Sequence, residues 1–194
     1  MRVEMTKTAL IAMLVVAAAL LAVAAARAAT TDTITVTAVV TGGATLSVAP
    51  NGPPPTFNLT LNGSDQTTPY TLGVIVVDAR GLASGGGWNL TITSTQFKDA
   101  TTHTFPTTAS TITGVTTGCG TNSTCTLPTN SISNTNLAVP AATVAPTAVK
   151  YLNAANATGL GTTNVNATVS VAVPANVFAG TYTSTVTVSI VSGP

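Results

Sequence analysis

Charged side chains are scarce in this sequence. Lysine and arginine number six and aspartate and glutamate five, so only 6% of the 194 residues carry a charge. A protein that binds nucleic acid or an anionic membrane needs a basic patch, and so few cations cannot form one. Disordered tails combine low hydrophobicity with high charge, which is the opposite of this composition. Abundant Thr, Asn, Gly and Val are instead typical of an exported, β-rich surface protein.

Residues that carry out acid–base or metal chemistry are equally few. The chain has one histidine, His103, and two cysteines, Cys119 and Cys125. General acid–base catalysis wants histidine or paired carboxylates, and no G-x-S-x-G nucleophile motif is present, so we expect no enzymatic activity. The five residues between the cysteines predict a local disulfide in an oxidising compartment. A zinc half-site is the alternative, but too few other ligands exist to complete it, and we predict neither a metal nor a cofactor.

The beginning of the chain has the pattern of an export signal. Two basic residues precede an apolar stretch over residues 8–26, and Ala26-Arg27-Ala28 places small residues where signal peptidase requires them. We predict a signal peptide at residues 1–28 and a single domain at residues 29–194. The apolar stretch is also compatible with a transmembrane anchor that is kept.

Strand patterns recur along the rest of the chain. Apolar and polar residues alternate with a period of two, which places apolar side chains on one face of a strand. The sequence predicts strands at residues 33–40, 44–48, 57–61, 70–78, 88–96, 165–173 and 181–191, a less regular region of hairpins and long loops at 98–150, and a single helical turn around 149–157. This pattern predicts an all-β fold, an antiparallel sandwich or barrel with Greek-key connections.

The only tryptophan opens one of these strands. A glycine run, Gly85-Gly86-Gly87, leads into a strand in which Trp88 and Leu90 share one face while Asn89 points the other way. A tryptophan at such a place either packs in the core or offers its ring to a ligand, and its large apolar area favours the core. The other aromatic side chains with a polar group are Tyr70, Tyr151 and Tyr182.

Two stretches of the sequence resemble the WxL-domain family of bacterial surface proteins. They are Gly87-Trp88-Asn89-Leu90 and the region from Val173 to Ile190, which contains Ala179-Gly180-Thr181-Tyr182. In that family a first W-x-L motif lies in the middle of the domain and a second closes the final strand. Trp88 and Leu90 match the first motif. Val188 and Ile190 stand where the second motif has Trp and Leu.

The resemblance implies a secreted, all-β domain that attaches noncovalently to the cell wall at the cell surface. Its expected partners are peptidoglycan, another wall polysaccharide or partner surface proteins, and Trp88, Asn89 and Leu90 are the tentative ligand-binding residues. A second hypothesis comes from the two ends of the domain, where the strands predicted at 33–40 and 181–191 contain no charged residue. Unprotected strand edges pair readily with another chain, so a homo-oligomeric surface fibre or layer is the alternative function.

Overall fold

The computed structural model describes residues 35–82 and 86–194, and the predicted signal peptide lies outside the described residues. The chain divides into two units, Met1–Val39 and Val40–Pro194, and every strand of the described residues belongs to the second. No helix in the described part is long and apolar enough to cross a membrane.

The described part of the second unit is built from β-strands. They are β1 (Leu46–Pro50), β2 (Gln66–Asp78), β3 (Trp88–Thr95), β4 (Ser110–Cys119), β5 (Leu137–Ala138), β6 (Ala141–Ala142), β7 (Val149–Ala154), β8 (Gly161–Val173) and β9 (Val186–Ser192). One sheet has the order β1-β2-β8-β4-β5. In the other, β3 is central, with β9 on one side and β7 and β6 on the other.

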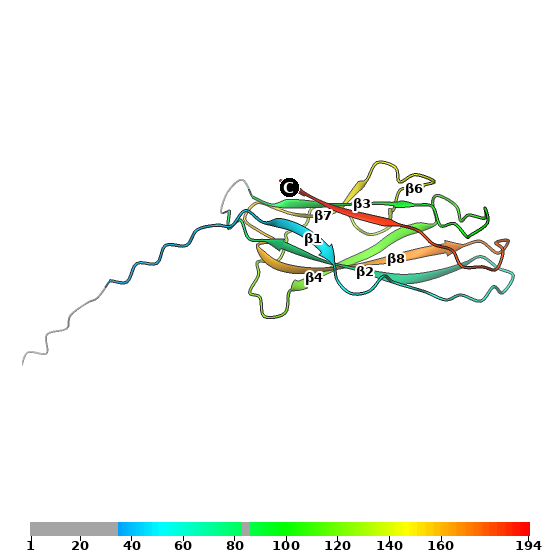
Figure 1. Cartoon of the computed structure of the whole chain (residues 1–194), viewed down its shortest axis with the longest axis horizontal. Helices are drawn as coiled ribbons and strands as arrows, with labels where there is room; N and C mark the ends of the chain where they lie inside the picture. The colour runs from blue at the N-terminus through cyan, green and yellow to red at the C-terminus, as the bar shows by residue number, and fades with distance from the viewer. Residues whose placement is uncertain (1–34, 83–85) are drawn as a thin grey trace, which may run out of the picture. The chain divides into compact units, whose positions relative to one another are not determined.

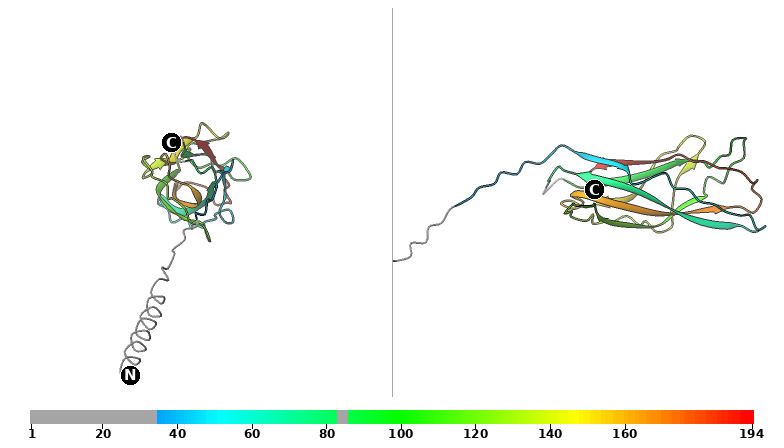
Figure 2. Two further views of the ribbon diagram at one scale, coloured as in Figure 1. Left: turned by 90° about the vertical axis from the view of Figure 1, so that its left-hand side faces the viewer. Right: turned by 60° about the horizontal axis from the view of Figure 1, so that its bottom comes forward.

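The two sheets face each other as an open sandwich (Figure 1, Figure 2). All strand pairs are antiparallel apart from the short β3–β6 contact. The prediction of an all-β fold is therefore confirmed, and of its two alternatives the structure is the sandwich, because the sheets do not close into a barrel.

The longest pairing joins β2 to β8 and shows why the alternating pattern was informative. The pairs run without interruption from Gln66↔Val173 to Asp78↔Gly161. Along β8, residues such as Val165, Val169 and Val171 are buried, and their polar neighbours face out, as period-two alternation requires. Pro174 follows directly and cannot extend the ladder, since it has no N–H.

Apolar side chains from both sheets fill the space between them. The main cluster surrounds Trp88, Leu90 and Ile92 of β3, which pack with residues of β2, β4, β7 and β8. A second cluster forms around Phe105, Val171 and Val173. Phe105 and Val173 of the second cluster also line a groove that is open to solvent and is described below.

Three strand predictions need correction. Residues 35–40 form no strand, and their valines are exposed. Residues 57–61 also form no strand, although Phe57 and Leu59 are half-buried and their neighbours exposed. An extended segment can bury alternate side chains without pairing its backbone, so alternation alone cannot tell the two cases apart. The strand predicted at 181–191 is shorter, because the regular ladder of β9 begins only at Val186.

Two further elements differ from the predictions. The helical turn expected around 149–157 is wrong, because Val149–Ala154 is strand β7, in which Tyr151 to Ala154 are all buried. Burial on both faces removes the alternation that would have identified it. Strand β4 was not predicted, because its sequence STITGVTTGC is rich in Thr and Gly and alternates weakly.

Candidate functional site

The first sequence motif lies in the core of the sandwich. The side chains of Trp88 and Leu90 are 0% exposed, and Asn89 is 4% exposed. The indole Nε1 of Trp88 donates a hydrogen bond to the carbonyl of Gly159 at 3.1 Å, so its polar atom is satisfied as well. All three side chains are buried in this structure, and their assignment as ligand-binding residues stays a prediction.

Two glycines allow close packing around Trp88, one against its indole and one against the neighbouring backbone. Gly159 has a positive φ of 71°, and a Cβ atom there would lie 2.6 Å from the Trp88 Nε1. Gly87 has a φ of 95°, and its Cβ atom would lie 2.5 Å from the carbonyl oxygen of Ala154. Glycine is the residue that tolerates both conditions. Gly85 of the same run lies outside the described residues, but Gly87 has a definite structural task.

The second sequence motif lies directly beside the first. Strand β9 pairs with β3 so that Ile190 is opposite Leu90 and Val188 is opposite Ile92. Val188 and Ile190 are half-buried and pack against the main core cluster. The residues at both motif positions therefore lie on two neighbouring strands and pack in or against the core. At the second motif Val188 does this with a smaller side chain than Trp.

An ion pair fastens the ends of these strands. The Arg80 guanidinium donates to both carboxylate oxygens of Asp78, to the carbonyl of Gly87 and to the hydroxyl of Ser192. Burial alone would raise the pKa of Asp78. The hydrogen bonds and the positive charge of Arg80 have the larger effect, so the pKa of Asp78 is lowered. This ion pair links the end of β2 to the beginning of β3 and the end of β9.

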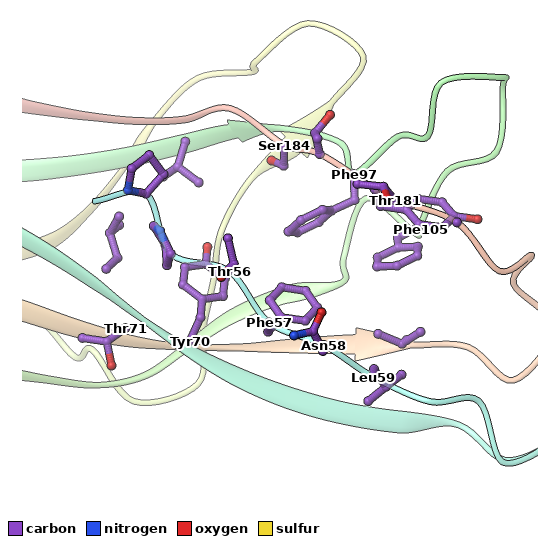
Figure 3. Close-up of a pocket in the computed structure, with 18 of the residues that line it drawn as sticks. Thr56, Phe57, Asn58, Leu59, Tyr70, Thr71, Phe97, Phe105, Thr181 and Ser184 are labelled. Atoms are coloured by element: carbon purple, nitrogen blue, oxygen red, sulfur yellow. The ribbon is translucent and has the colours of Figure 1, made fainter. Parts of the chain in front are cut away.

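Beyond the other end of β3, the sandwich opens into a groove of about 1280 Å³. One side is the extended segment 50–61, the other is the segment 177–184 that leads into β9, and the floor includes residues of β2 (Figure 3). Small-molecule sites measure about 300 to 1,000 Å³. The size of this groove suits a stretch of an extended polymer better than a small molecule.

Aromatic side chains converge in this groove. The chain has one Trp, three Tyr and four Phe. All four Phe and two of the Tyr line the groove: Phe57, Tyr70, Phe97, Phe105, Phe178 and Tyr182. Ring contacts run from Tyr70 to Phe57 (6.1 Å between ring centroids), on to Phe97 and Phe105, and to Tyr182 (4.3 Å from Phe105).

The groove contains no charged residue among those that line it. Its polar groups are hydroxyls, amides and backbone carbonyls, including those of Asn58, Thr71, Thr181 and Ser184 (Figure 3). Burial raises the pKa of Tyr70 to about 12, so its phenol stays neutral. Aromatic rings with neutral hydrogen-bonding groups can hold a ligand that is itself uncharged and presents both C–H faces and hydroxyls.

His103 lies beside the groove rather than in a catalytic arrangement. Its Nδ1 lies 2.7 Å from Asp99 and 2.9 Å from the Thr101 hydroxyl, and its ring stacks on Phe178 with centroids 4.2 Å apart. In a catalytic triad the carboxylate and the nucleophile occupy opposite imidazole nitrogens, whereas here both partners are at Nδ1. The hydrogen bonds among Asp99, Thr101 and His103 instead hold together the loop formed by residues 99–103. Among the described residues, no group of three or more His, Cys, Asp or Glu could hold a metal ion.

A scan against protein families supplies the remaining observation. The family model for the WxL domain, described as surface cell wall-binding, matches residues 44–194. The chain belongs to the WxL family. No curated protein and no solved structure shows significant similarity to it.

As a WxL domain, the chain is a cell-surface, cell-wall-binding protein. The matched residues include both motif strands and the whole groove. The predicted disulfide is also present: Cys119 and Cys125 are bonded, and they close a short loop after β4. This loop packs near Gly161, at the same end of the domain as Trp88.

The groove was largely missed by sequence reasoning. Tyr70 and Tyr182 were recognised as polar aromatic residues, and the structure brings both to the groove, while Tyr151 is in the core. Phe97, Phe105 and Phe178 lie outside the predicted strands, and this is the one signal in the sequence that could have set them apart. Phe57 lies in residues 57–61, where the alternation predicted a strand and so indicated ordinary core packing.

Proposed function

We propose that this WxL domain attaches noncovalently to the cell wall by holding an uncharged stretch of wall glycan in the aromatic groove, without catalysing a reaction. The observation that carries the proposal is the gathering of six aromatic side chains in one groove without charged lining residues. A pyranose ring presents a C–H face that stacks on an aromatic ring, and its hydroxyls pair with neutral donors and acceptors. Peptidoglycan strands have this chemistry.

In this proposal the motif residues act by holding the two strands that carry the groove. Phe97 follows directly after β3, and residues 181–184 lead into β9. Leu90 lies opposite Ile190 on these strands, and Asn89 donates a hydrogen bond to the carbonyl of Gly193. Loss of aromatic rings from the second motif therefore leaves the proposed binding surface intact.

The most informative residue for a test is Phe178. It is 64% exposed, so its removal does not open the core. The Phe178→Ala variant should bind purified cell walls about tenfold more weakly, because it loses an apolar ring from the contact. The measurement is co-sedimentation of the purified protein with walls over a range of protein concentrations.

Leu127→Ala is the matched control. Leu127 is 46% exposed and does not line the groove, so this variant should bind walls like the wild type. Peptide-free glycan strands should compete with walls for the protein. Equal wall binding by the Phe178→Ala variant and the wild type would contradict the proposal. Binding that appears only in the presence of other surface proteins would assign the attachment to a partner protein instead.

A further inference from the structure

One segment of the described chain has the pattern of a strand but no partner. Residues 35–41 are all β-branched except Ala38, and none of them is charged. Its valines are almost fully exposed: Val36 is 87%, Val39 88% and Val40 92% exposed. After this segment the chain is held, because the Gly43 N–H donates to the carbonyl of Ala79 at 2.7 Å. Contiguous exposed apolar residues of this kind mark an interaction site.

The sandwich has one edge strand that fits such a segment. Natural sheets protect their edges by short strands, charge, proline or bulges. In the described residues, β5 and β6 have two residues each, β1 has five and ends at Pro50, and β7 contains Lys150 and a register shift opposite β3. Each of these four strands therefore has a feature that hinders pairing with a further strand.

Strand β9 has none of these protections. It has seven residues, contains neither charge nor proline, and pairs with β3 in an unbroken register from Val186 to Ser192. Its strand partner in the described part of the chain is β3 alone, on one side. β1 of the facing sheet lies nearby, but its backbone pairs with β2. Val191 on β9 is 54% exposed.

We propose that residues 35–41 of one copy of this protein add as a β-strand to the free edge of β9 in a second copy. The two segments match in length, both lack charge, and both consist mainly of Thr, Ser and β-branched apolar residues, which form favourable cross-strand pairs. Strand addition of this kind satisfies the free backbone groups of the edge and buries the exposed valines. Each copy offers one segment and one edge, so the contact is head to tail and repeats along a row of molecules.

This interaction shares only Val186, the first residue of β9, with the lining of the proposed glycan site. It uses the ladder residues of β9 and the segment before β1, and it needs no cell wall. A failure of wall binding and a failure of assembly are therefore separate results, because assembly is measured with the protein alone.

The first test is the self-assembly of the purified protein in solution. Sedimentation velocity over a range of concentrations should show species larger than the monomer for the wild type. The double substitution V36K/V40K should raise the apparent dissociation constant at least about a hundredfold, because it removes two apolar contacts. Both positions are exposed, so the fold should be unaffected.

The matched control is Val144→Lys. Val144 is 80% exposed and lies in a loop outside both segments, so this variant should assemble like the wild type. Thr187→Lys, on the exposed face of β9, should weaken assembly from the acceptor side. A monomeric wild type at all concentrations would overturn the proposal, as would equal effects of V144K and V36K/V40K.

Cross-linking distinguishes a second copy from the same copy. Thr37→Cys and Ser189→Cys are made in separate molecules, which are then mixed and oxidised. A disulfide-linked dimer that contains one copy of each variant supports pairing between molecules. If the mixture gives no such dimer but the double variant forms the T37C–S189C bond within one chain, the segment pairs with its own β9 and the proposal is wrong.

Discussion

The two ends of β3 use aromatic side chains in opposite ways. At its beginning, Trp88 is completely buried, its Nε1 is satisfied by Gly159, and Arg80 ties the neighbouring strand ends together. After its end, Phe97 belongs to a series of rings that line an open groove between irregular segments. The comparison teaches that the family motif lies in the part of the domain that holds two strands together, while the rings that line the groove lie where the sequence has no named motif.

The largest expected effect comes from removing the buried indole. Trp88→Ala should lower the free energy of unfolding by about 3 to 5 kcal/mol, because it removes a large ring and leaves a cavity. Urea denaturation followed by circular dichroism measures this. Trp88→Phe should cost less, because it keeps most of the apolar volume. Equal stability of Trp88→Ala and the wild type would contradict the structural role of the motif.

The ion pair at the same end should give the next largest effect. Asp78→Asn should lower the free energy of unfolding by about 3 kcal/mol at pH 7, because it leaves the largely buried Arg80 without its counter-charge. The same denaturation experiment measures it. Asp65→Asn is the control, since the Asp65 side chain has no ion-pair partner among the described residues. An unchanged midpoint for Asp78→Asn would show that the pair does not stabilise this end.

The pH dependence of stability should follow from two carboxylates. In the folded protein the pKa of Asp78 is lowered. Burial alone would raise the pKa of Asp99, but hydrogen bonds from His103 and Thr101 lower it to about 2. Unfolded aspartates titrate near about pH 3.9. The ionised carboxylates therefore stabilise the fold above that pH, and this stabilisation is lost as the pH falls from about 4 towards 2 and below. Denaturation at pH 7, 4, 3 and 2 should show a smaller loss for Asp78→Asn than for the wild type.

The disulfide should have a smaller effect. Replacing Cys119 and Cys125 together with serine should cost about 2 kcal/mol, because the bond closes a loop with a sequence separation of only 6. Wall binding by the folded fraction should be unchanged, since neither cysteine lines the groove. A loss of wall binding without a loss of stability would place a binding surface at this loop.

The smallest effect on stability should come from the groove end. Phe178→Ala should change the free energy of unfolding by less than about 0.5 kcal/mol, because the ring is mostly exposed. Thermal unfolding measures this beside Trp88→Ala. If the two variants were equally destabilised, the contrast between a structural end and a binding end would fail.

The sequence predicts the parts of this fold in which apolar and polar residues alternate along a long strand. β8 and β3 follow from their alternation, and the disulfide follows from the close spacing of its cysteines. The sequence does not reveal which of two alternating segments finds a backbone partner, so residues 35–40 and 57–61 were assigned as strands. β7 is buried on both faces and shows no alternation at all.

The groove is harder to predict for a different reason. Phe57, Tyr70, Phe97, Phe105 and Tyr182 come from five separate segments, and they meet because β2, β3 and β9 end or begin on one side of the sandwich. Local patterns contain no information about such a meeting. The choice between core and ligand for Trp88 likewise depends on Gly159, seventy-one residues away.

The absence of charge from the groove has a consequence for how the protein would behave in its surroundings. Dissolved salt weakens contacts between exposed charges over about 8 Å at physiological ionic strength, and it weakens them further as the salt concentration rises. A contact made by aromatic rings and neutral hydroxyls has little for salt to screen, and salts that are excluded from protein surfaces strengthen apolar burial. Attachment through this groove would therefore persist through changes in salinity that release surface proteins held by opposite charges.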